Sequence, residues 1–157
     1  MSINGENMQI IVVSDNHRDY ELIEKLSQMY NKADLFLHAG DSCLREEEIY
    51  PFITVKGNQD YYITKVYRII EANGINIFLF HGHTSRLDPI VLSAIARNNN
   101  CQIIIHGHTH KPYYQVVEGI HILCPGSLAY PRSSRGKTYA IIDIDNQKNI
   151  NVRINDI

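Results

Sequence analysis

Residues 106–110, with the sequence HGHTH, constrain this chain more than any other feature. They follow the apolar residues 103–105 directly, so the histidines are expected where a buried strand ends. At a strand end, residues two apart point the same way, and several imidazoles would then face one spot. Such clustering is unfavourable unless a ligand binds there. A transition metal is the ligand that imidazoles predict.

Four further apolar segments, all upstream, also end in residues that can bind a metal. These residues are Asp15 and His17, Asp41, Asn58, and His81. In α/β sheets, functional sites gather beyond the carboxyl ends of the strands. We therefore predict that all five segments deliver oxygen and nitrogen ligands to one edge. Glycines beside four of the five sets would let the backbone turn tightly there.

The bulk properties of the chain limit its class. Its 157 residues suffice for one domain, residues 1–157, with a real core. The net charge of -2 predicts no general attraction to nucleic acid or anionic membranes. No apolar run approaches the ~20 residues that span a bilayer. Three scattered cysteines favour a reducing compartment, and the polar first seven residues lack the regions of a signal peptide, so we expect a cytoplasmic protein.

The first third of the chain alternates strand and helix patterns. An apolar run at 8–13 predicts a strand that is buried on both faces. An apolar stripe predicts a helix within 19–32. A short strand at 35–37, a short helix within 43–50 and a third strand at 52–55 follow. This β-α-β-α-β order implies parallel pairing with helical crossovers.

The rest of the chain reads mainly as hairpins. Strands at 67–71 and 75–80 flank Asn73-Gly74, a strong hairpin signal. A helix is expected at 88–97, with Asp88 as its N-cap and Pro89 in its first turn. A strand at 102–105 and two hairpins, 113–117 with 120–123 and 138–144 with 149–154, complete the pattern. Parallel strands, hairpins and three helices predict two packed sheets flanked by helices.

Taken in order, these blocks resemble the motifs of the calcineurin-like metallophosphoesterases. That family shows D-x-H, G-D, G-N-H-[D/E], H and G-H-x-H, and four of the five are intact here over about two thirds of the chain. G-H-T-H-x-P at 107–112 and P-G-S at 125–127 also resemble a small bacterial and archaeal phosphodiesterase branch. The resemblance and the strand pattern together predict a four-layer α/β/β/α sandwich of two mixed sheets flanked by helices.

The resemblance implies two divalent metal ions that share Asp41. One would bind Asp15, His17, Asp41 and His108, and the other Asp41, Asn58, His81 and His106. Nitrogen and oxygen ligands without thiolate suit Mn, Fe, Zn, Ni or Co, and we expect Mn. A water between the metals would lose a proton near neutral pH and attack phosphorus in line. We therefore expect hydrolysis of a small phosphoester, with diesters favoured over monoesters.

Two positions depart from the family pattern. Gln59 stands where many members have a histidine that is thought to protonate the leaving group, and glutamine cannot serve as that acid. His83 or His110 would then take this role. Asn58 would also orient the phosphate, and Arg132, after the Pro-Gly-Ser turn, is the best candidate for binding it. Cys124 replaces an asparagine that usually precedes Pro-Gly-Ser, and no role is assigned to it.

Simpler interpretations stay open for individual residues. A single strand-end histidine is more often polar surface than a ligand, and His38 and His121 fit that description. Asp15 and Asp41 could be helix caps, and Asp60 could be either a turn residue or a support for the site.

A second function competes with hydrolysis. The retromer scaffold subunit has the same fold, works mainly through protein contacts and has some ligand positions altered. Here all the ligand positions carry side chains that can bind metals, which favours an enzyme. Relatives often form dimers or tetramers, so homo-oligomerisation is a further expectation, although no apolar stripe marks an interface.

Overall fold

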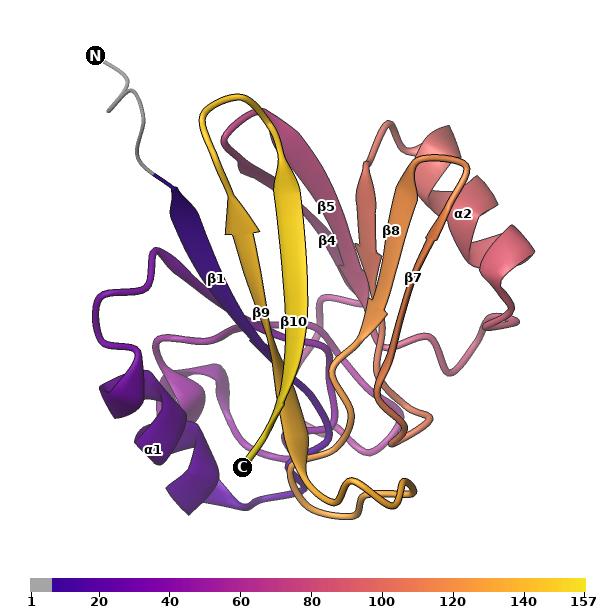
Figure 1. The fold of residues 1–157 in the computed structure, drawn as a ribbon. Coiled ribbons are helices and arrows are strands. Elements are labelled where there is room, and N and C mark those ends of the chain that lie inside the picture. The colour runs from indigo at the N-terminus through magenta and orange to yellow at the C-terminus, as the bar shows by residue number, and fades with distance from the viewer. Residues whose placement is uncertain (1–6) are drawn as a thin grey trace.

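Two five-stranded sheets pack face to face in the computed structural model, which describes residues 7–157 (Figure 1). The first sheet has the order β10-β9-β1-β2-β3. Its strands are β1 (Met8–Val13), β2 (Leu35–His38), β3 (Ile53–Thr54), β9 (Thr138–Ile144) and β10 (Ile150–Asp156). The second sheet has the order β4-β5-β6-β8-β7. It comprises β4 (Tyr67–Ala72), β5 (Ile75–Phe80), β6 (Ile103–Ile105), β7 (Tyr113–Val117) and β8 (Ile120–Cys124).

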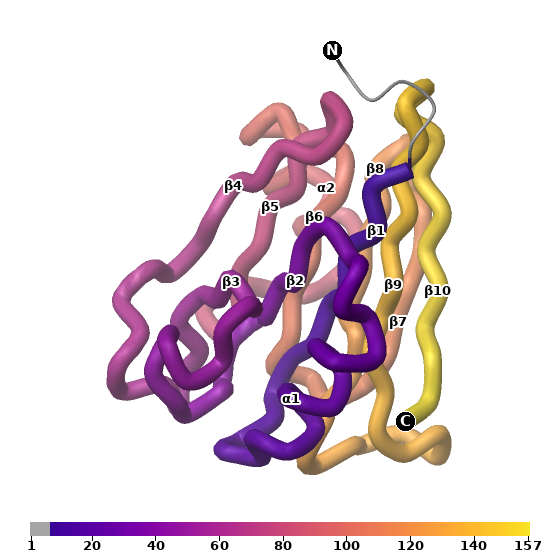
Figure 2. The backbone as a smooth tube through the Cα atoms, turned by 90° about the vertical axis from the view of Figure 1, so that its left-hand side faces the viewer, coloured from indigo at the N-terminus to yellow at the C-terminus, as the bar shows by residue number. Residues whose placement is uncertain are grey.

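Each sheet carries one α-helix on its outer face. Helix α1 (Tyr20–Met29) covers the first sheet, and α2 (Pro89–Asn98) covers the second on the opposite side of the molecule (Figure 1). Edge strands β3 and β4 lie along one side of the sandwich, away from β10 and β7 (Figure 2). The predicted four-layer α/β/β/α sandwich of two mixed sheets is thus confirmed.

Alternation along the buried strands explains why they read as continuous apolar runs. In β1, Ile10 and Val12 face the core between the sheets, whereas Ile11 and Val13 face the layer under α1. In β6, Ile103 likewise faces the inter-sheet core, and Ile104 packs under α2. Complete burial of such a side chain contributes roughly 1.5–3 kcal/mol, so both faces of these strands must be apolar.

The pairing of strands follows the predicted pattern. Strand β1 pairs in parallel with β2, and β2 with β3, as the alternation of strands and helices predicted. In the second sheet, β6 pairs in parallel with both β5 and β8. The carboxyl ends of the parallel strands therefore meet at one edge of the sandwich.

The three predicted hairpins are also present. Strands β4–β5, β7–β8 and β9–β10 each pair antiparallel. Asn73 and Gly74 join the first pair with φ of 50° and 80°. Positive φ at both central residues matches the twist of the flanking strands and is the reason for the Asn-Gly preference.

Two helices differ from the prediction. The segment expected as a short helix within 43–50 forms only a 3-10 turn, η1 (Glu46–Ile49). The next residue, Tyr50, is extended because a proline disfavours helical backbone in the residue before it. Helix α1 ends at Met29, short of the predicted limit at residue 32. Asp88 caps α2 by accepting from Val91 N, as expected.

Within residues 7–157, no helix has both the length and the hydropathy needed to cross a bilayer. Residues 1–6, which carry most of the argument about a signal peptide, lie outside the described part of the chain.

Candidate metal centre

The loops that follow β1, β2, β3, β5 and β6 converge at the carboxyl edge of the two sheets. They bring together two groups of side chains. Within each group, the ligand atoms all lie within 4.8 Å of one another. The His110 group consists of Asp15, His17 and His110, and the His81 group consists of Asp15, Asp41 and His81. The prediction that separate strand ends deliver ligand-type residues to one place therefore agrees with the geometry.

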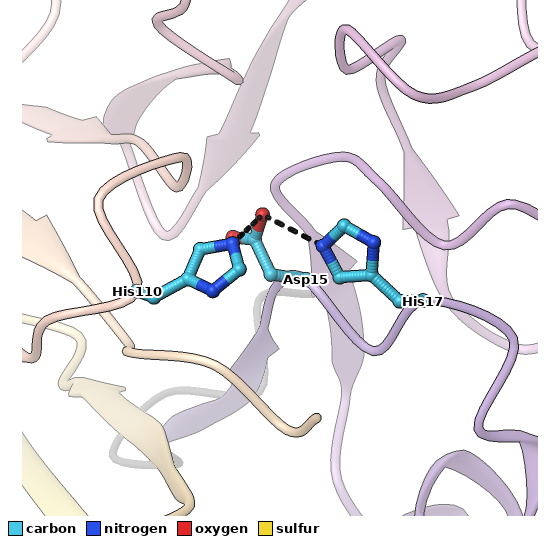
Figure 3. A group of neighbouring side chains, drawn as sticks. All are labelled: Asp15, His17 and His110. Carbon is cyan, nitrogen blue, oxygen red and sulfur yellow. Dashed lines mark ion pairs between the residues drawn. The ribbon is translucent and has the colours of Figure 1, made fainter. Parts of the chain in front are cut away.

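In the His110 group, two imidazoles face one carboxylate oxygen. His110 Nε2 lies 3.1 Å from Asp15 Oδ1, and His17 Nε2 lies 3.7 Å from the same atom. The two rings approach the carboxylate from opposite sides (Figure 3). Asp15 Oδ1 and His17 Nε2 are buried, and neither forms a hydrogen bond within the described structure. Buried polar atoms without partners are rare, and these two fit a site that is completed by a cation.

In the His81 group, one imidazole faces three oxygen acceptors. His81 Nε2 lies 3.0 Å from Asn58 Oδ1, 3.3 Å from Asp41 Oδ2 and 3.9 Å from Asp15 Oδ1. His81 Nδ1 donates to the carbonyl of Ala39 at 2.8 Å, which fixes the ring and turns Nε2 toward the acceptors. The His108 ring lies 5.2 Å from the His81 ring, centroid to centroid.

Asp41 belongs to the His81 group and also approaches the His110 group. Its Oδ2 faces His81 and also lies 3.9 Å from His17 Nε2. Its Oδ1 accepts a hydrogen bond of 2.8 Å from the backbone N–H of Gln59. One oxygen is therefore held by the protein while the other faces imidazoles of both groups. Sequence reasoning missed this use of Gln59, because a backbone donor leaves no trace in the residue type.

His38, a buried residue of β2, links the loop after β1 to the loop after β2. Its Nδ1 accepts from Gly40 N at 3.0 Å, so the ring proton is on Nε2, which donates to Asn16 Oδ1 at 2.6 Å. Complete burial lowers the pKa of His38 to about 4, which keeps the ring neutral. His38 thus connects the loop that carries Asp15 to the loop that carries Asp41.

Several of these residues have left-handed backbone. Positive φ occurs at Asp15, His17, Asp41, His108 and His110. Such values are uncommon outside glycine and cluster at functional sites. The sequence predicted that the histidines alternate at a strand end. In the structure β6 ends at Ile105, so the histidines project from a strained loop. The alternation expected at a strand end does not set their directions.

Two glycines are required by close approach. A Cβ atom on Gly57 would collide with Asp41 Oδ1, and one on Gly107 would collide with Ser14 Oγ. Neither glycine has a positive φ. Each is needed because another part of the site lies against its backbone, which explains why glycine stands beside the ligand-type residues at these two loops.

The carboxylates and imidazoles shift one another's ionisation. Burial alone would raise the pKa of Asp15, but the imidazoles of His110 and His17 outweigh it and hold the pKa well below its usual range. Burial would also lower the pKa of His81, yet Asp41 and Asp15 raise it. The pKa of His110 is raised chiefly by Asp15. The negative charge of the site therefore favours positively charged partners for these carboxylates.

His106, predicted to bind the second metal, belongs to neither group. It is 3 % exposed, its Nδ1 donates to the carbonyl of Gly107 at 2.9 Å, and burial lowers its pKa. It lines a separate cavity of about 330 Å³ together with Leu87 and Thr109. In the structure the side chain grouped with Asp15 and His17 is that of His110, whereas His108, predicted for that metal, reaches Asp15 Oδ2 through its backbone N–H at 3.1 Å.

The remaining predicted residues surround the site. A cavity of about 260 Å³ is lined by His17, Asp41, Asn58, Gln59, His108, His110, Tyr130 and Arg132. His83 does not line this cavity; it is exposed, with its ring 5.5 Å from that of His81 and 6.3 Å from that of His108.

Sequence reasoning missed Tyr130, whose ring packs edge-on against His17 at 5.3 Å and whose carbonyl accepts from His110 Nδ1 at 2.7 Å. The only sequence signal for it is the nearby Pro-Gly-Ser turn. Ser127 of that turn donates to the carbonyl of Asp15 at 2.8 Å and accepts from Tyr130 N at 2.9 Å. The turn therefore holds the loop of Tyr130 against the loop of Asp15. Cys124 is buried, with its Sγ 3.6 Å from Thr109 Oγ1.

Comparison with known proteins agrees with this geometry. The model of the calcineurin-like phosphoesterase superfamily domain matches residues 8–147. The chain belongs to this superfamily. The probable metallophosphoesterase MJ0623 of Methanocaldococcus jannaschii is 33% identical over 140 residues, which cover 83% of this chain and 73% of that protein. Phosphodiesterase YfcE of Escherichia coli is 23% identical over 168 residues, covering 88% of this chain and 89% of YfcE.

Solved structures of this superfamily fold match over nearly the whole chain. A predicted phosphoesterase from Streptococcus pneumoniae superposes with a TM-score of 0.83 at 27% identity, covering 97% of this chain and 99% of that chain. Vacuolar protein sorting 29 from Cryptosporidium parvum gives a TM-score of 0.75 at 18% identity, covering 96% and 98%, a likeness that shows the fold alone. Family membership and the buried His/Asp groups make this chain a metallophosphoesterase.

We predict that metal binding weakens as the pH falls. A metal binds a neutral imidazole, and the pKa values of His81 and His110 are raised, so protons compete with the metal increasingly below those pKa values. Each displaced proton should change the affinity about tenfold per pH unit. Calorimetric titration with Mn²⁺ between about pH 5.5 and 8, in buffers of different ionisation enthalpy, measures both affinity and proton release.

The matched control replaces a histidine outside the site. His121 in β8 bonds to the hydroxyl of Tyr114 at 2.7 Å, so His121→Gln should keep the wild-type pH dependence. Affinity that does not change with pH, with no proton released, would contradict the prediction.

Proposed function

We propose that this protein is a dinuclear metal-dependent phosphodiesterase that hydrolyses a small phosphoester. One observation carries the proposal: side-chain oxygens of Asp15, Asp41 and Asn58 converge on His81 Nε2, and no lysine or arginine pairs with them in the described structure. Such a set binds divalent cations such as Mn²⁺, with Fe, Zn, Ni or Co as alternatives. YfcE, a named phosphodiesterase of similar length, supports the choice of a diester.

We assign the ligands by the distances described above. One metal would be held by Asp15, His17, Asp41 and His110. The other would be held by Asp41, Asn58, His81 and His108. Asp41 Oδ2 faces histidines of both groups, as does Asp15 Oδ1, and we take Asp41 as the shared carboxylate because the family resemblance implies it. Compared with the assignment from sequence, His110 takes the place of His108 at the first metal, and His108 takes the place of His106 at the second. When bound, the metals supply a nucleophile derived from water near neutral pH and neutralise charge on the phosphoryl oxygens.

The protein's own side chains would bind and orient the substrate. Asn58, Tyr130 and Arg132 line the cavity beside the His/Asp groups, and Arg132 can give two parallel hydrogen bonds to a phosphate. The backbone N–H of Arg132 donates to the carbonyl of His110 at 3.0 Å, which fixes its position relative to the site. With His110 assigned to a metal, His83, which is exposed beside His81, is the imidazole that would protonate the leaving group.

Replacing Asp41 by asparagine tests the proposed activity. The wild-type protein should hydrolyse bis(p-nitrophenyl) phosphate with added Mn²⁺, and Asp41→Asn should lose at least about 100-fold, because a neutral amide weakens both metals. Release of p-nitrophenol measures the rate. Asp143→Asn serves as the control, because Asp143 lies in β9 and pairs with Arg153 at 3.4 Å. A folded, metal-loaded wild type without activity would favour the non-catalytic scaffold.

The ligand assignment has its own test. His110→Ala should lose one bound metal per chain, because His110 Nε2 faces Asp15. His106→Ala should keep both, since His106 already bonds to Gly107 and belongs to neither group. Elemental analysis after equilibrium dialysis against Mn²⁺ counts the metals. The opposite pattern, with loss in His106→Ala and retention in His110→Ala, would restore the assignment that the sequence suggested.

A further inference from the structure

A second buried carboxylate, that of Asp60, lies behind the site. Asp60 is 6 % exposed, and its oxygens accept from backbone N–H groups only. Oδ2 accepts from Asp41 N at 2.8 Å and from Gly57 N at 2.7 Å, and Oδ1 accepts from Cys43 N at 2.9 Å. One side chain therefore bonds to two loops, the loop after β2 that carries Asp41 and the loop after β3 that carries Asn58.

These two loops also bond in the reverse direction. The backbone N–H of Gln59 donates to Asp41 Oδ1 at 2.8 Å. Within the described structure, no lysine, arginine or histidine pairs with the Asp60 carboxylate, since Lys56 Nζ reaches only the backbone oxygen of Asp60. Three N–H donors hold its charge, and bonds to a charged acceptor are roughly twice as strong as neutral ones.

A turn residue would not need this arrangement. The local turn is closed by the backbone bond from Asp60 N to the carbonyl of Gly57, at 3.2 Å. The bonds to Asp41 and Cys43 span 19 and 17 residues and do nothing for that turn. Their effect is to fix the distance between the loops.

We propose that Asp60 is a positioning residue that sets Asn58 against Asp41 and thereby completes the metal site of Asn58, His81 and His108. This inference rests on the proposed dinuclear function. The other metal site, of Asp15, His17, Asp41 and His110, shares Asp41 but takes no ligand from the loop after β3, which is the loop that carries Asp60. Its loops are joined by other bonds, from Asp15 N to Gly40 O at 3.0 Å and from His17 N to Asp41 O at 3.1 Å.

The variant Asp60→Asn isolates the carboxylate. An amide has a single acceptor oxygen, and its NH₂ group would face a backbone N–H on the other side. If the oxygen takes the place of Oδ2, the bond to Cys43 is lost; if it takes the place of Oδ1, the bonds to Asp41 and Gly57 are lost. Loosening of the two loops should therefore weaken chiefly the metal site that contains Asn58, because the other site takes no ligand from the loop after β3.

Asp145→Asn is the matched control. Asp145 also accepts from two backbone N–H groups, Gln147 N at 2.9 Å and Asn149 N at 2.8 Å, but in the exposed turn between β9 and β10. It reproduces the chemical change without touching the site.

Equilibrium dialysis against Mn²⁺ over a range of free metal, followed by elemental analysis, measures both sites without relying on activity. Wild type and Asp145→Asn should bind two metals per chain with the same two affinities. In Asp60→Asn one affinity should fall about 10–100-fold while the other changes much less. Asn58→Ala, which removes the ligand itself, should give the same one-sided loss. If Asp60→Asn does not fold, Asp60→Glu, which keeps the acceptors on a longer side chain, takes its place.

Three results would overturn the inference. Asp60→Asn with both affinities unchanged would do so directly. An equal loss at both sites, with a fall in the free energy of unfolding of the metal-free protein, would show a merely structural role. A wild type that binds fewer than two metals would overturn the dinuclear proposal as well, which separates the failure of the function from the failure of Asp60 alone.

Discussion

Two buried carboxylates, those of Asp15 and Asp41, face the same small volume at the carboxyl edge of the sheets. Like charges brought so close in a buried place are unfavourable unless cations offset them. The same carboxylates raise the pKa of His81 and His110, whose imidazoles face them. Divalent metals would offset the negative charge, and the same atoms would then serve as their ligands. The electrostatics of the site therefore favour the binding of cations.

The rest of the fold holds this arrangement in place. Parallel pairing of β1, β2 and β3 sets the loops side by side, and the apolar faces of those strands bury them in two cores. Left-handed backbone at Asp15, Asp41 and His110 costs of order 1–3 kcal/mol each, which the surrounding structure must offset. Gly57 and Gly107 let the loops approach one another. The free energy gained by burying the sheets thus offsets the cost of the left-handed backbone at the site.

Sequence reasoning predicted the layers, the hairpins and the place where the site forms, because hydrophobic periodicity and strand-end residues record those features directly. It chose His106 and His108 as metal ligands and His110 as a candidate acid, although the G-H-x-H block at 107–110 contains His108 and His110. Which of these histidines face the site is set by the left-handed backbone after Ile105, which the residue types do not reveal. The backbone donor of Gln59 and the three bonds to Asp60 were equally invisible, since they join loops through N–H groups that every residue carries.

A crystal structure of the protein loaded with Mn²⁺, with anomalous scattering recorded at the manganese edge, tests the central claim most directly. Two peaks roughly 3.5–4 Å apart are expected, both in contact with the Asp41 carboxylate. His110 should contact one and His108 the other. A single peak, or a metal bound by His106 in place of His110, would contradict the account.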